Sequence, residues 1–85
     1  MAERKMIDVR DETEYNQEHI PGATSIPVSE LQRRHTELQK DDEITVVCNR
    51  GGQRSRRAAE ILREKGYEQV EIYEGGMAAW KQEGE

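Results

Sequence analysis

The stretch that decides the fold passes from an apolar run, through a glycine-rich loop, to the start of a helix. It reads Ile44-Thr45-Val46-Val47-Cys48-Asn49-Arg50-Gly51-Gly52-Gln53-Arg54-Ser55. The run of β-branched residues predicts a strand from Glu43 to Cys48. Because its apolar residues occupy both faces, we expect this strand to be the central, most buried one of its sheet. Ser55 is expected to start the helix that follows.

The position of Cys48 suits a reactive thiolate. Glycines after the cysteine allow several backbone N–H groups to converge, and the start of a helix adds positive potential, so both favour S⁻ over SH. A buried cysteine acting as a small hydrophobe is the commoner role of a lone thiol, but that role needs neither the glycines nor Arg54. The loop therefore predicts a site for an anion or an anionic sulfur, with Arg54 as a ligand.

The rest of the chain alternates short strands with helices. Three more strands are predicted, at Lys5–Arg10, Ala23–Ile26 and Gln69–Tyr73. Helical segments are predicted over 11–18, from an N-cap at Ser29 to Lys40, from Ser55 to a stop at Gly66, and over 77–82. Strands separated by helices predict an α/β domain with a central parallel sheet. Ligands bind at the carboxyl ends of such strands, where Cys48 is expected to lie.

Length and composition exclude several classes of protein. Eighty-five residues allow a single domain, 1–85, and the formal charge of -5 disfavours nonspecific nucleic-acid binding, although Arg50, Arg54, Arg56 and Arg57 form a local basic cluster. No apolar run approaches the roughly 20 residues that span a bilayer. One cysteine forms no internal disulfide and, without clustered ligands, predicts no metal and no cofactor. A reducing cytoplasm is the expected compartment.

An ordered series of motifs resembles the rhodanese family over nearly the whole chain. The series is Asp8-Val9-Arg10, Glu14-Tyr15, His19-Ile20-Pro21-Gly22-Ala23, Ile26-Pro27, Cys48 with Arg54-Ser55, Gly66-Tyr67 and Gly75-Gly76-Met77-Ala78-Ala79-Trp80. The resemblance implies a rhodanese-like three-layer α/β domain, with a parallel sheet flanked by helices. Family members usually carry a helix and a strand ahead of the first motif, so one edge of this sheet is expected to be trimmed.

The resemblance implies a sulfurtransferase in which Cys48 is the catalytic nucleophile. The thiolate would take a sulfane sulfur from thiosulfate or a similar anionic donor and hold it as a persulfide. A thiol, or a partner protein, would then accept the sulfur, and the protein itself is expected to be a monomer. The implied binding residues are those of the loop: Asn49, Arg50, Gly51, Gly52, Gln53 and Arg54. Asp8 and Arg10 are expected to tie the first strand to the loop that follows it.

Two alternatives stay open because the loop departs from the usual pattern. Arg54 lies six positions after Cys48, one more than in the usual sulfurtransferase loop, and this spacing resembles Cdc25-like phosphatases and arsenate reductases. Against that reading, Val47 stands where those phosphatases carry His. Such an enzyme also needs a proton donor, for which Asp8, Asp11 and Glu14 are candidates if the fold brings one close. The third hypothesis is a non-catalytic module whose loop binds an anion or a partner.

Overall fold

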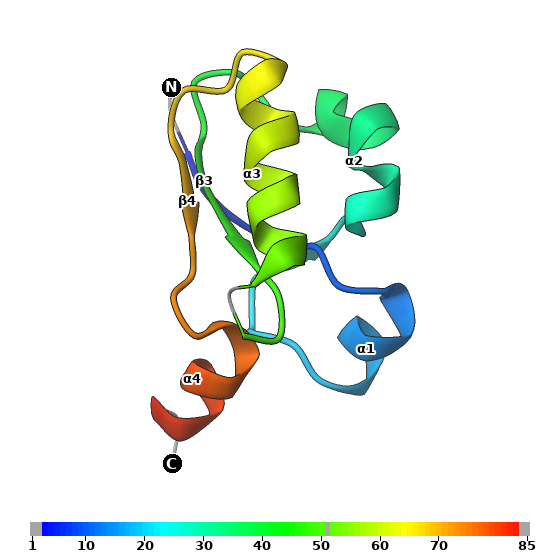
Figure 1. Ribbon diagram of the computed structural model, residues 1–85, viewed down its shortest axis with the longest axis vertical. Helices are drawn as coiled ribbons and strands as arrows, with labels where there is room; N and C mark the ends of the chain where they lie inside the picture. The colour runs from blue at the N-terminus through cyan, green and yellow to red at the C-terminus, as the bar shows by residue number, and fades with distance from the viewer. Residues whose placement is uncertain (1–2, 51, 84–85) are drawn as a thin grey trace.

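The computed structural model describes residues 3–50 and 52–83, and within them the chain forms a four-stranded sheet with helices (Figure 1). The strands are β1 (Arg4–Asp8), β2 (Thr24–Ser25), β3 (Glu43–Val47) and β4 (Val70–Ile72), in the order β2-β1-β3-β4. Every pairing is parallel. The predicted parallel α/β architecture is therefore confirmed.

Strand β3 is central because both of its faces are apolar. Val46 packs into the larger core cluster with Ile7 and Leu62, whereas its neighbour Val47 packs into a second cluster with Met77. Successive side chains of a strand point to opposite faces, so the two clusters lie on the two sides of the sheet. In the register, Val47 stands opposite Asp8, which places the ends of β1 and β3 at the same edge.

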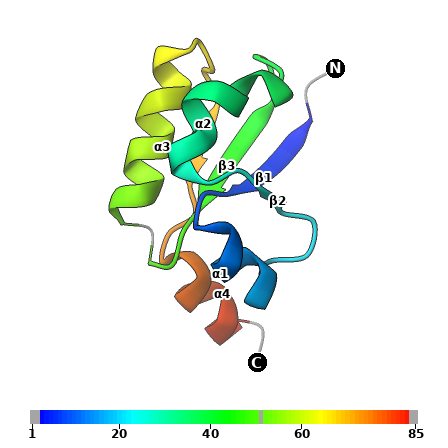
Figure 2. The same cartoon turned by 90° about the vertical axis from the view of Figure 1, so that its right-hand side faces the viewer.

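Helices form the two outer layers, but they cover the sheet unequally. The helices α2 (Val28–Arg34) and α3 (Gln53–Glu64) pack together along one face (Figure 1). The short helices α1 (Glu12–Gln17) and α4 (Gly76–Glu83) both lie near the carboxyl ends of the strands (Figure 2), and Glu18, the C-cap of α1, forms an ion pair of 2.9 Å with Lys81 of α4. The carboxyl end of the sheet is thus enclosed by more of the chain than the amino end.

The boundaries of α2 and α3 differ from the predictions. Helix α2 begins at Val28, with Pro27 rather than Ser29 at the N-cap, and ends at Arg34, where a 3-10 turn, η1 (His35–Glu37), follows. This turn redirects the chain so that Leu38 is buried, 7% exposed, outside the helix. Helix α3 begins at Gln53, two residues before the predicted Ser55, because Gly52 takes the N-cap position.

The end of α3 agrees with the prediction. Lys65 is the C-cap and Gly66 follows it with φ 97°, a left-handed conformation that glycine adopts without strain.

None of the helices over residues 3–50 and 52–83 is long and apolar enough to cross a membrane. In the same part of the chain, no group of three or more His, Cys, Asp or Glu side chains is arranged to hold a metal ion.

Candidate active site

Cys48 follows directly on the last residue of β3 and begins the loop that leads into α3. Its side chain is 3% exposed and lies against a shallow hollow at the carboxyl edge of the sheet. The hollow is lined by Cys48, Asn49, Arg50, Gly52, Gln53 and Arg54. The structure thus brings together the predicted site residues, apart from Gly51, which lies outside the described residues.

The surroundings of Cys48 favour the thiolate. Burial raises the pKa of the thiol, but the Ser55 hydroxyl and the backbone N–H groups of Ser55, Arg50 and Gly52 lower it by more, so the net shift is downward from the ordinary value of 9.0. Ser55 Oγ is buried and meets no other hydrogen-bond partner among the described residues. Its hydroxyl is therefore free to donate to the sulfur once the sulfur is charged.

Helix α4 fixes the loop after Cys48 through two backbone hydrogen bonds. The N–H of Met77 donates to the carbonyl oxygen of Cys48 at 2.8 Å, and the N–H of Ala78 donates to that of Asn49 at 3.0 Å. These two bonds turn the carbonyls towards α4, which leaves the N–H groups of the loop for the sulfur. Gly76 permits the approach, because a Cβ at this position would overlap the carbonyl oxygen of Cys48 and lie 2.8 Å from the nitrogen of Arg50.

Arg54 reaches the site but is already paired. Its Nη1 donates to Glu14 Oε1 at 2.6 Å and its Nη2 to Glu14 Oε2 at 3.3 Å. Glu14 Oε2 also accepts from Asn49 Nδ2 at 2.8 Å, and Glu14 Oε1 from the N–H of Asp11 at 3.2 Å. The hydrogen bond from Arg54 is the main reason that the pKa of Glu14 falls to about 2. The sequence predicted Arg54 as a ligand of the bound anion, but it did not predict the partner Glu14, which lies 40 positions away along the chain.

Asp8 and Arg10 support the loop from the neighbouring strand. The guanidinium of Arg10 donates to the Asp8 carboxylate, at 2.9 Å from Nε and 2.7 Å from Nη2, and both side chains are buried. Arg10 Nη2 also donates to the carbonyl oxygen of Glu18 at 2.7 Å, and its Nη1 to Asn49 Oδ1 at 3.3 Å. The pair thus ties β1 to the segment after it, as predicted, and also fixes the Asn49 side chain.

Two of the three candidate proton donors for phosphate chemistry, Asp8 and Glu14, are poorly suited to that role. Asp8 is buried in its ion pair with Arg10. Glu14 lies beside the loop, but with a pKa of about 2 it is ionised at neutral pH and has no proton to give. The groups that the structure assembles are therefore a thiol with a lowered pKa, converging N–H donors and arginine side chains, which suit a nucleophile that attacks or holds an anion.

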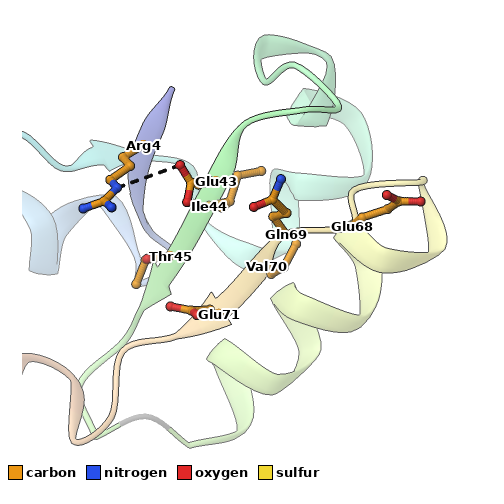
Figure 3. Close-up of a pocket in the computed structure, with 8 residues that line it drawn as sticks. All are labelled: Arg4, Glu43, Ile44, Thr45, Glu68, Gln69, Val70 and Glu71. Carbon is orange, nitrogen blue, oxygen red and sulfur yellow. Dashed lines mark ion pairs between the residues drawn. The ribbon is translucent and has the colours of Figure 1, made fainter. Parts of the chain in front are cut away.

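A second hollow, of about 510 Å³, lies at the opposite end of the sheet (Figure 3). It is lined by Arg4, Glu43, Ile44, Thr45, Glu68, Gln69, Val70 and Glu71. Its ion pair, between Arg4 and Glu43, has a separation of 3.8 Å and side chains that are 89% and 47% exposed. None of the lining residues is a cysteine, serine or histidine, so this hollow offers no comparable nucleophile.

Comparison with known proteins agrees with the geometry. The family model for the rhodanese-like domain matches residues 1–83. The thiosulfate sulfurtransferase PspE of Escherichia coli is 44% identical, over 82% of this chain and 68% of its own length. A protein named sulfurtransferase from Allochromatium vinosum is 34% identical over 93% of this chain and 73% of its own length. The chain spans about half the length of the first curated relatives it matches.

The fold has solved counterparts at similar identity. The crystal structure of the rhodanese-like domain of the Alr3790 protein from Anabaena sp. superposes with a TM-score of 0.88 at 37% identity, covering 94% of this chain and 92% of the other. Together with the parallel sheet and the loop at Cys48, these matches show that the chain belongs to the family of rhodanese-like domains.

Proposed function

We propose that this protein is a sulfurtransferase that moves a sulfane sulfur from a small anionic donor, such as thiosulfate, to a thiophilic acceptor through a persulfide on Cys48. The single observation that supports this best is the lowered pKa of a nearly buried thiol facing the N–H groups of Arg50, Gly52 and Ser55. Relatives named as sulfurtransferases, and one from Bacillus subtilis named as a sulfur carrier, support the same chemistry.

The proposed reaction has two displacement steps. In the first, the Cys48 thiolate attacks the outer sulfur of thiosulfate, the bond between the two sulfur atoms breaks, and sulfite leaves with the electron pair. The terminal sulfur of the persulfide keeps a negative charge, which the N–H groups of Arg50 and Gly52 can stabilise. In the second, an acceptor thiolate or cyanide attacks that terminal sulfur and the Cys48 thiolate leaves.

The acceptor in this proposal is external. Cys48 is the chain's single cysteine, so no thiol of the same chain can take the sulfur. A free low-pKa thiol is best preserved in a reducing compartment, which supports a cytoplasmic location. The candidate substrate-binding residues remain those of the loop: Asn49, Arg50, Gly51, Gly52, Gln53 and Arg54.

Intact-protein mass spectrometry tests this function directly. The reduced protein is incubated briefly with thiosulfate, beside the Cys48→Ser variant as the matched control. We expect the wild type alone to gain the mass of one sulfur atom and to lose it again on addition of cyanide. A gain of equal size on the Cys48→Ser variant, or no adduct on the wild type with either thiosulfate or a thiosulfonate, would overturn the proposal.

The six-position spacing from Cys48 to Arg54 favours one second candidate, a phosphatase or arsenate reductase that uses the same nucleophile. Glu14, the carboxylate beside the loop, is ionised and cannot protonate a leaving group at neutral pH. Hydrolysis of an aryl phosphate by the wild type, lost in Cys48→Ser, would establish this activity. If neither chemistry is found and the Cys48 pKa proves ordinary, a module that only binds an anion or a partner becomes the better account.

A further inference from the structure

Arg54 is already paired with an anionic side chain of the protein itself, Glu14. The Glu14 carboxylate accepts hydrogen bonds from Arg54, from Asn49 Nδ2 and from the N–H of Asp11, so both of its oxygens are occupied. Its side chain is 29% exposed, which places it at the rim of the site rather than in the core. A donor that uses Arg54 must therefore share that guanidinium with a carboxylate.

With Cys48 as a thiolate, the charges of the loop and of the two arginine–carboxylate pairs beside it balance one another. The thiolate of Cys48 and the carboxylates of Asp8 and Glu14 contribute three negative charges, and Arg10, Arg50 and Arg54 contribute three positive ones. Of these cations, Arg50 is exposed and forms no ion pair with another described residue. Without Glu14 the same site would carry a net charge of one positive unit, and a doubly charged donor would gain more from that change than a singly charged donor.

We propose that Glu14 is a specificity-determining residue that makes the site favour sulfane donors with one negative charge, such as thiosulfonates and persulfides, over doubly charged ones. This inference rests on the sulfur transfer proposed above and names the class of donor. Glu14 touches Arg54 and Asn49 rather than Cys48. Its effect is therefore expected on donor binding and not on the displacement itself.

Thiosulfate and methanethiosulfonate form a matched pair of donors, because one charged oxygen of the first is replaced by a methyl group in the second. Both give the same Cys48 persulfide. Attack of the thiolate on the outer sulfur releases sulfite from thiosulfate and methanesulfinate from methanethiosulfonate, with the electron pair of the broken bond on the leaving group. Hydroxyethyl persulfide, a third donor, carries one charge and no sulfonyl group, so it separates charge from recognition of sulfonyl oxygens.

The test compares the steady-state kinetics of the three donors in the wild type, in Glu14→Gln and in Glu12→Gln. Glu12 is an exposed glutamate of the same helix and serves as the control. For the wild type we expect a KM for thiosulfate about tenfold above that for methanethiosulfonate. In Glu14→Gln we expect the KM for thiosulfate to fall about fivefold, with kcat and the KM of both singly charged donors within about twofold of wild type. Glu12→Gln should match the wild type.

Other outcomes would overturn the inference. An equal loss of kcat with all three donors in Glu14→Gln would mean that Glu14 only positions Arg54. A wild type that prefers thiosulfate would contradict the donor class directly. Inhibition of the unaltered protein by sulfate and methanesulfonate gives a measurement independent of the variant's folding, and methanesulfonate should bind at least as tightly. Absence of transfer from every donor would instead reject the proposed function itself.

Discussion

The two ends of the sheet each carry a hollow and an arginine–glutamate ion pair, yet only one end is arranged for chemistry. At the amino end, Arg4 and Glu43 stand 3.8 Å apart on exposed side chains (Figure 3). At the carboxyl end, Arg54 and Glu14 stand 2.6 Å apart on side chains that are 34% and 29% exposed, beside a buried thiol. The difference lies in what surrounds each pair.

The convergence of several chain segments, rather than the size of a hollow, identifies the site. The carboxyl ends of parallel strands bring the loop after β3, the segment after β1 and the start of α4 to one place. At the amino end the lining comes from side chains of the strands and of the turn before β4, and exposed pairs of this kind contribute little to stability. Four substitutions test this contrast, in decreasing order of their predicted consequences.

Gly76→Ala should disturb the carboxyl end most. Gly76 has φ 56°, and a new Cβ would lie 2.7 Å from the carbonyl carbon of Asn49, so the loop or α4 must move. We expect the free energy of unfolding to fall by about 3 kcal/mol, measured by urea denaturation. Gly22→Ala is the matched control, because Gly22 has φ 89° but open space around it, and it should cost only about 1 kcal/mol. Equal losses in the two variants would show that the contact at Gly76 does not matter.

Ser55→Ala should raise the pKa of Cys48 without unfolding the protein. The hydroxyl of Ser55 is one of the groups that lower this pKa, and its removal decreases the fraction of thiolate at neutral pH. We expect alkylation by iodoacetamide at pH 7 to slow by about fivefold, with the two proteins converging at a pH above both pKa values. Ser29→Ala, at an exposed position of α2, provides the control. An unchanged pH profile in Ser55→Ala would remove Ser55 from the site.

Glu14→Gln should affect stability in a way that depends on pH. The folded pKa of Glu14 is about 2, below its ordinary value of 4.5, so its ionised form stabilises the fold above pH 4.5 and this contribution is lost as the pH falls through 2. Because the pair with Arg54 is partly exposed, we expect only about 1 kcal/mol at pH 7. Urea denaturation of both proteins between pH 7 and pH 2 measures it, and a difference that stayed constant over this range would contradict the assignment.

Arg4→Ala should change almost nothing. The side chain is 89% exposed and its partner, Glu43, is also exposed, so solvent screens the pair. Sulfur transfer should remain within about twofold of wild type, and the melting temperature should barely move. A large loss of activity would mean that the amino end contributes to function, and the contrast between the two ends would fail.

The sequence contains enough local information to predict the strand, the loop and the helix around Cys48. A run of β-branched residues marks β3, and glycine marks the loop, so both could be predicted from neighbouring residues. The helix predicted from Ser29 to Lys40 is present, but its boundaries were wrong, because Pro27 takes the N-cap position and because the chain leaves α2 at Arg34 to bury Leu38.

The parts of the site that could not be predicted from the sequence are contacts between residues distant in the chain. Glu14 was considered as a proton donor, but its pairing with Arg54 depends on how α1 and α3 meet at the carboxyl edge. Gly76 directly precedes the helix predicted over 77–82, and its closeness to the Cys48 carbonyl is set by the docking of α4. No local propensity contains this information, since it arises from packing.

The bonds from α4 to the loop make the last helix part of the thiol's environment. Because the Met77 and Ala78 amides donate to the carbonyls of Cys48 and Asn49, they can exchange with solvent deuterium only when the loop and the helix separate. A persulfide or an alkyl group on Cys48 that strains the loop would therefore accelerate exchange at these two amides. The rate of deuterium exchange at the Met77 and Ala78 amides would therefore report whether a group on Cys48 loosens the loop from α4.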